Sequence, residues 1–137
     1  MSEGEIATAV VVVHHLEQAR AALRATAEAG CAIELQSAPG AAGYAGVGYL
    51  KALGDQAGRE LWIDCDDDAG LVMAALRTGC RRVLFSGRDD VRVRLADMAG
   101  QLGAALIAAD AAGRTLIVLR PDDDAAAVVR AHLAEMR

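Results

Sequence analysis

Aromatic residues are almost absent from this chain of 137 residues, in which Phe, Trp and Tyr together make up 3%. Its hydrophobic content of 54% therefore comes mainly from Ala, Val, Leu and Ile, which predicts a core with many close contacts between small side chains. Single-stranded nucleic acids are bound by aromatic side chains interleaved with basic ones, and the sequence has no such platform. This scarcity argues against a nucleic-acid partner.

Positive charge is also scarce, because the net charge is -5 and Lys51 is the only lysine. Nucleic acids and anionic membranes are bound by dense patches of Lys and Arg. The pair Arg81-Arg82 is too small to form such a patch. We therefore expect neither nucleic acid nor a membrane surface as a partner.

Long apolar runs and paired cysteines are missing as well. Residues 6–13 form the longest apolar run near the N-terminus, and this run is far too short to cross a bilayer. The acidic N-terminus differs from a secretory signal, which carries positive charge. The cysteines Cys31, Cys65 and Cys80 are odd in number and have no C-x-x-C spacing, which favours free thiols in a reducing compartment. We expect a cytoplasmic protein, with Cys31 and Cys80 buried at strand starts.

What the sequence does contain is an internal repeat. Residues 21–24 (AALR) precede Gly30-Cys31, an apolar run and Ser37, and residues 74–77 (AALR) precede Gly79-Cys80, an apolar run and Ser86. A glycine just after a helix supplies the left-handed residue that ends it, and a five-residue apolar run has the length of a buried strand. The pattern predicts a repeated return from helix to strand, as in parallel α/β domains.

The whole chain can be divided in the same way. Strands are predicted at residues 6–13, 32–36, 60–65, 81–85, 105–109 and 115–119, and helices at 16–29, 41–58, 69–78, 89–102 and after the aspartates 122–124. The loop 110–114 between the last two strands has the length and glycine of a β-hairpin turn. The stripe Val128, Val129, Leu133 and Met136 makes the final helix a lid on the core or a dimer contact.

These elements predict one α/β domain over residues 1–137. We expect three layers around a mostly parallel sheet of five or six strands, with a C-terminal β-hairpin and a terminal helix. Doubly wound, flavodoxin-like and partial-barrel arrangements remain open. Because the chain is rich in alanine, we also expect helix faces to be buried in a homo-oligomer.

Ligands of open parallel sheets bind where the strands end, since helix N-termini and loop amides converge there. His14, His15 and Asp64 follow such strand ends, and they are the candidate catalytic residues. A histidine here could act as a general base, although a capping histidine bonded to a loop is the more economical interpretation. The aspartates at 66–68 resemble a helix cap more than a cation site, so we assign no metal.

Two glycine-containing loops are candidates for binding an anion. Ser37 and Gly40 follow one strand, and Ser86, Gly87 and Arg88 follow another. Glycines expose backbone amides, and an arginine adds a fixed positive charge. Neither loop has the spacing of a Walker A or dinucleotide-binding motif, so no cofactor is indicated. Cys65 lies between Asp64 and Asp66, which disfavour its thiolate and a nucleophilic role.

The segment from Asp64-Cys65 through residues 74–77 and Gly79-Cys80 to residues 83–87 (VLFSG) resembles strand–helix–strand units of (βα)8-barrel enzymes. In that family a strand ending in Ser-Gly often opens a phosphate site, and the resemblance implies the same for Ser86-Gly87. The chain also resembles small bacterial α/β proteins of about this length, a class without an assigned activity.

Three functions remain open from the sequence. The first is the binding of a small anionic ligand at the carboxyl ends of the strands. The second is an enzyme acting on a small phosphorylated or carboxylated metabolite. The third is a structural scaffold that assembles through its alanine-rich helices and has no ligand.

Overall fold

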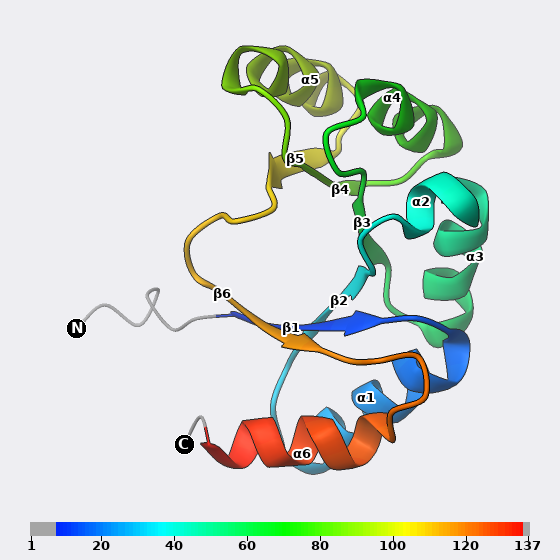
Figure 1. The fold of residues 1–137 in the computed structure, drawn as a ribbon, viewed down its shortest axis with the longest axis vertical. Helices are drawn as coiled ribbons and strands as arrows, with labels where there is room; N and C mark the ends of the chain where they lie inside the picture. The colour runs from blue at the N-terminus through cyan, green and yellow to red at the C-terminus, as the bar shows by residue number, and fades with distance from the viewer. Residues whose placement is uncertain (1–7, 136–137) are drawn as a thin grey trace.

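Six parallel strands form one curled sheet in this computed structural model, which describes residues 8–135 (Figure 1). The spatial order of the strands is β5-β4-β3-β2-β1-β6. Their bounds are β1 Thr8–Val13, β2 Glu34–Ser37, β3 Leu61–Asp64, β4 Arg82–Phe85, β5 Ala105–Ala108 and β6 Arg114–Val118. The fold class predicted from the sequence, α/β with a mostly parallel sheet, is confirmed.

All the helices described lie on the convex side of the sheet (Figure 1). They are α1 Leu16–Glu28, α2 Ala41–Tyr44, α3 Val47–Ala57, α4 Ala69–Thr78, α5 Asp89–Gln101 and α6 Ala125–Glu135. Strands β1 to β5 are added in one direction, and right-handed crossovers then place every connecting helix on the same face. Of the arrangements left open by the sequence, the partial barrel is the one found, and no second helical layer covers the sheet within residues 8–135.

The core lies between the sheet and this single layer of helices. Alternate strand residues such as Val11, Leu35, Ile63 and Val83 are almost fully buried there. The helices contribute small side chains to the same core, among them the fully buried Ala19, Ala22, Ala75 and Ala99. Small residues let the helices approach the sheet closely, as the composition predicted.

The predicted C-terminal hairpin is wrong. β5 pairs with β4 at one edge of the sheet and β6 pairs with β1 at the other, and both pairings are parallel. Residues 109–113 cross the open side of the half-barrel to connect them (Figure 1). The pairing with β1 buries Ile117 against the helices and lets α6 pack beside α1, which a hairpin with β5 could not do.

The predicted helix 41–58 is two helices rather than one. α2 ends at Tyr44, and α3 begins at Val47 after Gly46, whose φ of 93° is outside the helical region. A residue with a side chain rarely adopts this conformation, so Gly46 sets the break. The remaining predicted elements agree with the structure to within a few residues at each end, whereas positions 6, 7 and 136 lie outside the described residues.

Candidate functional site at the carboxyl ends of the strands

The candidate residues gather on one rim of the sheet, as the sequence predicted. His14, Ser37, Asp64 and Ser86 lie at or directly after the ends of β1, β2, β3 and β4. These strands are parallel, with Val13 beside Ser37 and Asp64 beside Leu84, so their carboxyl ends share an edge. The side chains on this rim nevertheless have very different surroundings.

A turn at residues 64–66 connects three strand ends through hydrogen bonds. The Asp64 N–H donates to the Ser37 hydroxyl oxygen at 2.9 Å, and the Asp66 N–H donates to Asp64 Oδ1 at 2.9 Å. The Gly40 N–H donates to Asp66 Oδ2 at 3.1 Å, and the Ser86 N–H donates to the Asp66 carbonyl at 2.8 Å. Ser37 is fully buried, so its hydroxyl serves the fold at this rim.

The two histidines hold the end of β6 against the start of α1. His14 Nε2 lies 2.7 Å from the Leu119 carbonyl oxygen, and His15 Nε2 lies 3.0 Å from that of Pro121. His15 Nδ1 also accepts from the Gln18 N–H at 3.4 Å and caps α1. Because a carbonyl oxygen only accepts, each facing ring nitrogen carries a proton. Both imidazoles therefore make the capping contacts considered from the sequence.

Asp64 does not lie on the strand next to the histidines, because β2 separates β3 from β1. The three candidate catalytic residues His14, His15 and Asp64 therefore do not come from adjacent strands. Within residues 8–135 no cluster of three or more His, Cys, Asp or Glu side chains has the arrangement of a metal site. Asp68 instead caps α4 by accepting from the Leu71 N–H at 3.1 Å.

Asp64 is a buried carboxyl group, with 6% of its surface exposed. Burial raises its pKa above the ordinary value, because the charged form loses hydration, and the neighbouring Asp66 charge acts in the same direction. The hydrogen bond from the Asp66 N–H and the more distant Arg114 oppose this shift without cancelling it. The candidate catalytic residue Asp64 is therefore a weaker acid than an ordinary aspartate.

Two hollows flank the turn between β4 and α5. One has a volume of about 340 Å³ and is lined by Phe85, Ser86, Gly87, Asp89, Arg92, Ala108, Ala109 and Asp110. The other has about 460 Å³ and is lined by Asp67, Ala69, Phe85, Ser86, Gly87, Arg88 and Val91. Ser86 and Gly87 thus border both hollows, which have the size of small-molecule sites.

Four charged groups give the β4–α5 turn its electrostatic character. Arg88, a predicted anion ligand, is exposed and directs its guanidinium to Asp90, with Nη2 to Oδ2 at 2.7 Å. Arg92, which the sequence reasoning missed, lines the smaller hollow and lies 3.6 Å from Asp89. One sequence signal could have identified Arg92. It lies one helical turn after Arg88, on the predicted helix that follows the candidate anion-binding loop.

In the described part of the chain, no side-chain hydrogen bond caps the amino end of α5. His15 and Asp68 accept hydrogen bonds from the first turns of α1 and α4, whereas Arg88 at the start of α5 makes no such cap. The first N–H groups of a helix have no partner within the helix. Those of α5 are therefore left to solvent or to a ligand beside Ser86 and Gly87.

The cysteines divide into one exposed and two buried thiols. Cys65 is fully buried, and burial together with the charge of Asp64 raises its pKa to about 12. Burial also raises the pKa of Cys80, with a further contribution from Glu60. Cys31 is exposed, so the prediction that it is a buried core residue like Cys80 is wrong. Its strand begins three residues later, at Glu34, and leaves Cys31 in the preceding loop.

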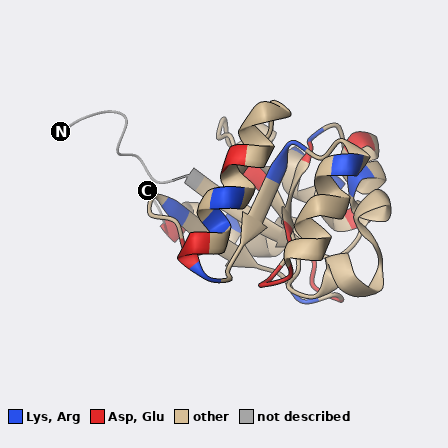
Figure 2. Cartoon of the chain, turned by 90° about the horizontal axis from the view of Figure 1, so that it is seen from above, with Lys and Arg blue, Asp and Glu red and all other residues tan. Residues whose placement is uncertain are grey.

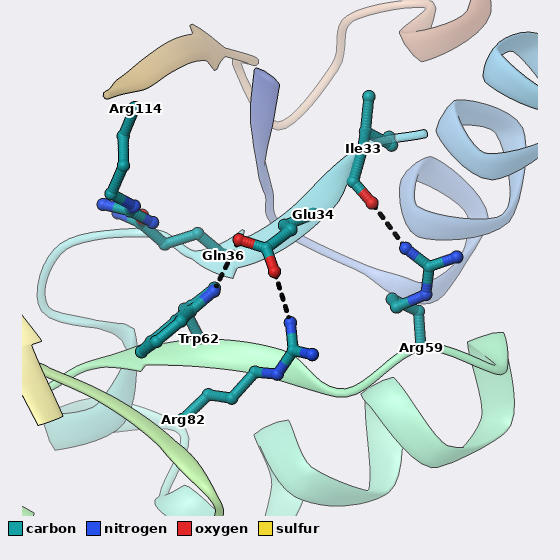
Figure 3. A network of polar contacts seen from close by, with 7 residues as sticks. All are labelled: Ile33, Glu34, Gln36, Arg59, Trp62, Arg82 and Arg114. Atoms are coloured by element: carbon teal, nitrogen blue, oxygen red, sulfur yellow. Dashed lines mark hydrogen bonds and ion pairs between the residues drawn. The ribbon is translucent and has the colours of Figure 1, made fainter. Parts of the chain in front are cut away.

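A polar network on the concave face was not predicted at all (Figure 3). Arg82 pairs with Glu34 at 2.6 Å, and Glu34 accepts from Trp62 Nε1 at 3.0 Å. Arg114 lies on the other side of Trp62, and each guanidinium carbon is 5.7 Å from the centroid of the indole ring. No local sequence pattern indicates this network, because its members come from four separate strands.

Comparison with protein-family models finds no match for this chain, and comparison with curated proteins finds none either. The resemblance to barrel enzymes is confirmed at the level of architecture, because alternating strands and helices form a curled, parallel half-barrel. Fold alone does not define an activity. The function must therefore be argued from the rim itself.

Proposed function

We propose that this domain binds a small phosphorylated or carboxylated molecule at the turn between β4 and α5. The observation that carries the proposal is the position of Ser86 and Gly87. They lie between two hollows and directly before a helix whose amino end has no side-chain cap. Uncapped helix amides and the helix dipole favour an anionic group at such a position.

The side chains around the hollows add requirements to the ligand. Arg92 supplies a positive charge to the smaller hollow, whereas Asp89 and Asp110 supply carboxylates that accept hydrogen bonds. A simple anion would meet both attraction and repulsion there. A molecule that carries hydroxyl groups as well as its anionic group satisfies both, because hydroxyls donate to carboxylates. A sugar phosphate is the simplest representative of this class.

Ser37 and Gly40 have no part in this proposed site, although the sequence suggested them. Ser37 is buried and bonded to Asp64, and the Gly40 N–H is bonded to Asp66. The ligand set that we propose is Ser86, Gly87, the first amides of α5 and Arg92. Arg88 borders the larger hollow, where a ligand would compete with Asp90 for its guanidinium.

Figure 2 shows acidic and basic residues mixed along the chain, which supports a small ligand in preference to a polyanion. Several basic side chains are also paired with carboxylates on the same helix, as in Arg20–Glu17 and Lys51–Asp55. Within residues 8–135, no helix is long and apolar enough to span a bilayer.

Thermal unfolding in the presence of ligands tests the proposal. A ligand at a hundredfold its dissociation constant adds about 2.7 kcal/mol to the free energy of unfolding. We expect a sugar phosphate to raise the melting temperature of the wild type, and Arg92→Gln to weaken binding about tenfold or more. Arg94→Gln is the matched control, because Arg94 is an exposed arginine on the same helix that lines neither hollow. Equal binding by both variants would refute the role of Arg92.

A further inference from the structure

A second cluster lies on the concave face, around Arg114 at the amino end of β6. Arg114 Nη2 donates to Gln36 Oε1 at 2.7 Å, and Nη1 donates to the Ala109 carbonyl oxygen at 3.3 Å. The Nε atom is buried and has no hydrogen-bond partner among the described residues. A guanidinium carries five N–H donors, so these two bonds leave it short of acceptors.

Arg114 also makes no ion pair with any described residue. Within residues 8–135, no carboxylate lies within ion-pair distance of Arg114, whereas Arg82 on the other side of Trp62 is paired with Glu34. Burial lowers the pKa of Arg114, because a partly desolvated cation is less stable than a hydrated one, and the charges of Glu34 and Asp64 oppose this shift from beyond ion-pair distance. A guanidinium in this condition gains from a carboxylate that can accept two parallel hydrogen bonds.

The same face of β6 continues with exposed apolar side chains. Ile117 is fully buried toward the helices, so the alternation along a strand directs Leu116 and Val118 to the face that carries Arg114. Leu116 is 42% exposed and Val118 is 63% exposed. Strand β6 is an edge strand, and none of the described helices covers this face (Figure 1).

Arg114, Leu116 and Val118 thus form a strip, here called the β6 strip, with a cation at one end and apolar groups along the rest. The distance along the strand from Arg114 to Val118 is about 13 Å. This is comparable with the length of a medium-chain alkyl group. Burying that hydrocarbon against Leu116 and Val118 would remove apolar surface from water on both molecules.

We propose that the β6 strip binds a hydrophobic carboxylate, with the carboxylate on Arg114 and the hydrocarbon along Leu116 and Val118. A cation without an ion-pair partner among the described residues matches a ligand with one negative charge. The β6 strip is distinct from the proposed rim site, because Arg114, Leu116 and Val118 line neither of the rim hollows. The two sites are neighbours, since the Ala109 carbonyl that Arg114 contacts belongs to a residue that lines the smaller hollow.

Trp62 gives this site its own reporter, since it is the only tryptophan of the chain and Arg114 lies over its ring. The probe is octanoate below its critical micelle concentration, and octanol is the uncharged control. We expect octanoate to change the Trp62 emission in a saturable way and to raise the melting temperature. We expect octanol to bind at least tenfold more weakly, and Arg114→Gln to reduce the affinity for octanoate at least tenfold.

A second pair of variants separates the apolar contact from general effects on the fold. Val118→Asn removes an exposed apolar group from the β6 strip, and Val93→Asn removes one that is 61% exposed from α5. We expect the first to weaken octanoate binding severalfold and the second to leave it unchanged. This pair decides the question if Arg114→Gln fails to fold. Absence of a response to octanoate, or equal affinity in wild type and Val118→Asn, would overturn the proposal.

Discussion

Gly87 lies directly against the ring of Phe85, so that a β-carbon at position 87 would overlap the ring atoms. Phe85 is buried at the end of β4, with 2% of its surface exposed. The close approach explains why a glycine stands at this point of the rim. Because Phe85 and Gly87 both line the two hollows, their contact also contributes to the shape of each hollow.

The first prediction concerns this contact. Gly87→Ala should lower the free energy of unfolding by about 1–3 kcal/mol, because the ring of Phe85 must be displaced. Gly100→Ala is the control, since Gly100 lies within α5 and a β-carbon there would meet no atom within 4 Å. That change should stabilise the protein by about 0.4–1 kcal/mol. Urea unfolding measures both, and equal effects would contradict the described packing.

The two serines of the internal repeat provide a second test. Ser37→Ala removes the acceptor of the buried Asp64 N–H and should cost about 1–3 kcal/mol. Ser86→Ala changes an exposed residue at the equivalent position of the repeat and should change stability by less than about 0.5 kcal/mol. Denaturant unfolding of the two variants compares them directly. A larger loss of stability for Ser86→Ala than for Ser37→Ala would contradict the assignment of the structural role to Ser37.

A third prediction follows from the raised pKa of Asp64. As the pH rises above the ordinary value of 3.8, the unfolded chain loses the Asp64 proton before the folded protein does. Stability falls with pH across that window, which ends once the pH has passed the folded-state pKa. Asp64→Asn abolishes this loss, because the amide oxygen can still accept from the Asp66 N–H.

The measurement is the free energy of unfolding of wild type and Asp64→Asn between about pH 3 and pH 7. Carboxylates that do not interact with Asp64 contribute equally to both proteins and cancel in the difference. We expect the variant to gain stability relative to the wild type as the pH rises. A constant difference, or one of opposite sign, would show that Asp64 is ionised as easily as in the unfolded chain.

The fourth prediction concerns thiol reactivity. Cys31 is exposed, whereas Cys65 and Cys80 are buried and have raised pKa values. Since the thiolate is the reactive form, an aromatic disulfide reagent at mildly alkaline pH should modify Cys31 rapidly. Cys65 and Cys80 should react only as the protein unfolds. Mass spectrometry of the labelled peptides distinguishes them, and rapid labelling of Cys65 in the folded protein would contradict its burial.

The sequence was sufficient to predict most of the individual elements. The glycine after each AALR segment ends a helix, and Asp68 caps α4 as expected from its place before an apolar helix. The gathering of the strand ends on one rim also follows from parallel pairing. These features depend on local chemistry, which the sequence displays.

The sequence could not predict which strand pairs with β6. The loop 109–113 has the composition of a hairpin turn, but β6 pairs with β1, about a hundred residues away in the chain. This pairing depends on the burial of Ile117 and on the packing of α6 beside α1. Both involve contacts between residues that are far apart in the sequence. For the same reason, the meeting of Arg82, Trp62 and Arg114 on the concave face has no local signature. Assembly into a homo-oligomer stays a prediction.

Chemical-shift mapping of the backbone amides during titration with a sugar phosphate tests the proposed function most directly. We predict saturable shifts of the Gly87 to Val91 amides, where the uncapped start of α5 meets the two hollows, and weaker binding in Arg92→Gln. The amide signals of residues 14–18 should keep their chemical shifts, because these residues form the cap of α1 on the same rim but lie outside the proposed site. An absence of shifts, or shifts centred on residues 14–18 in place of the start of α5, would contradict the proposed site.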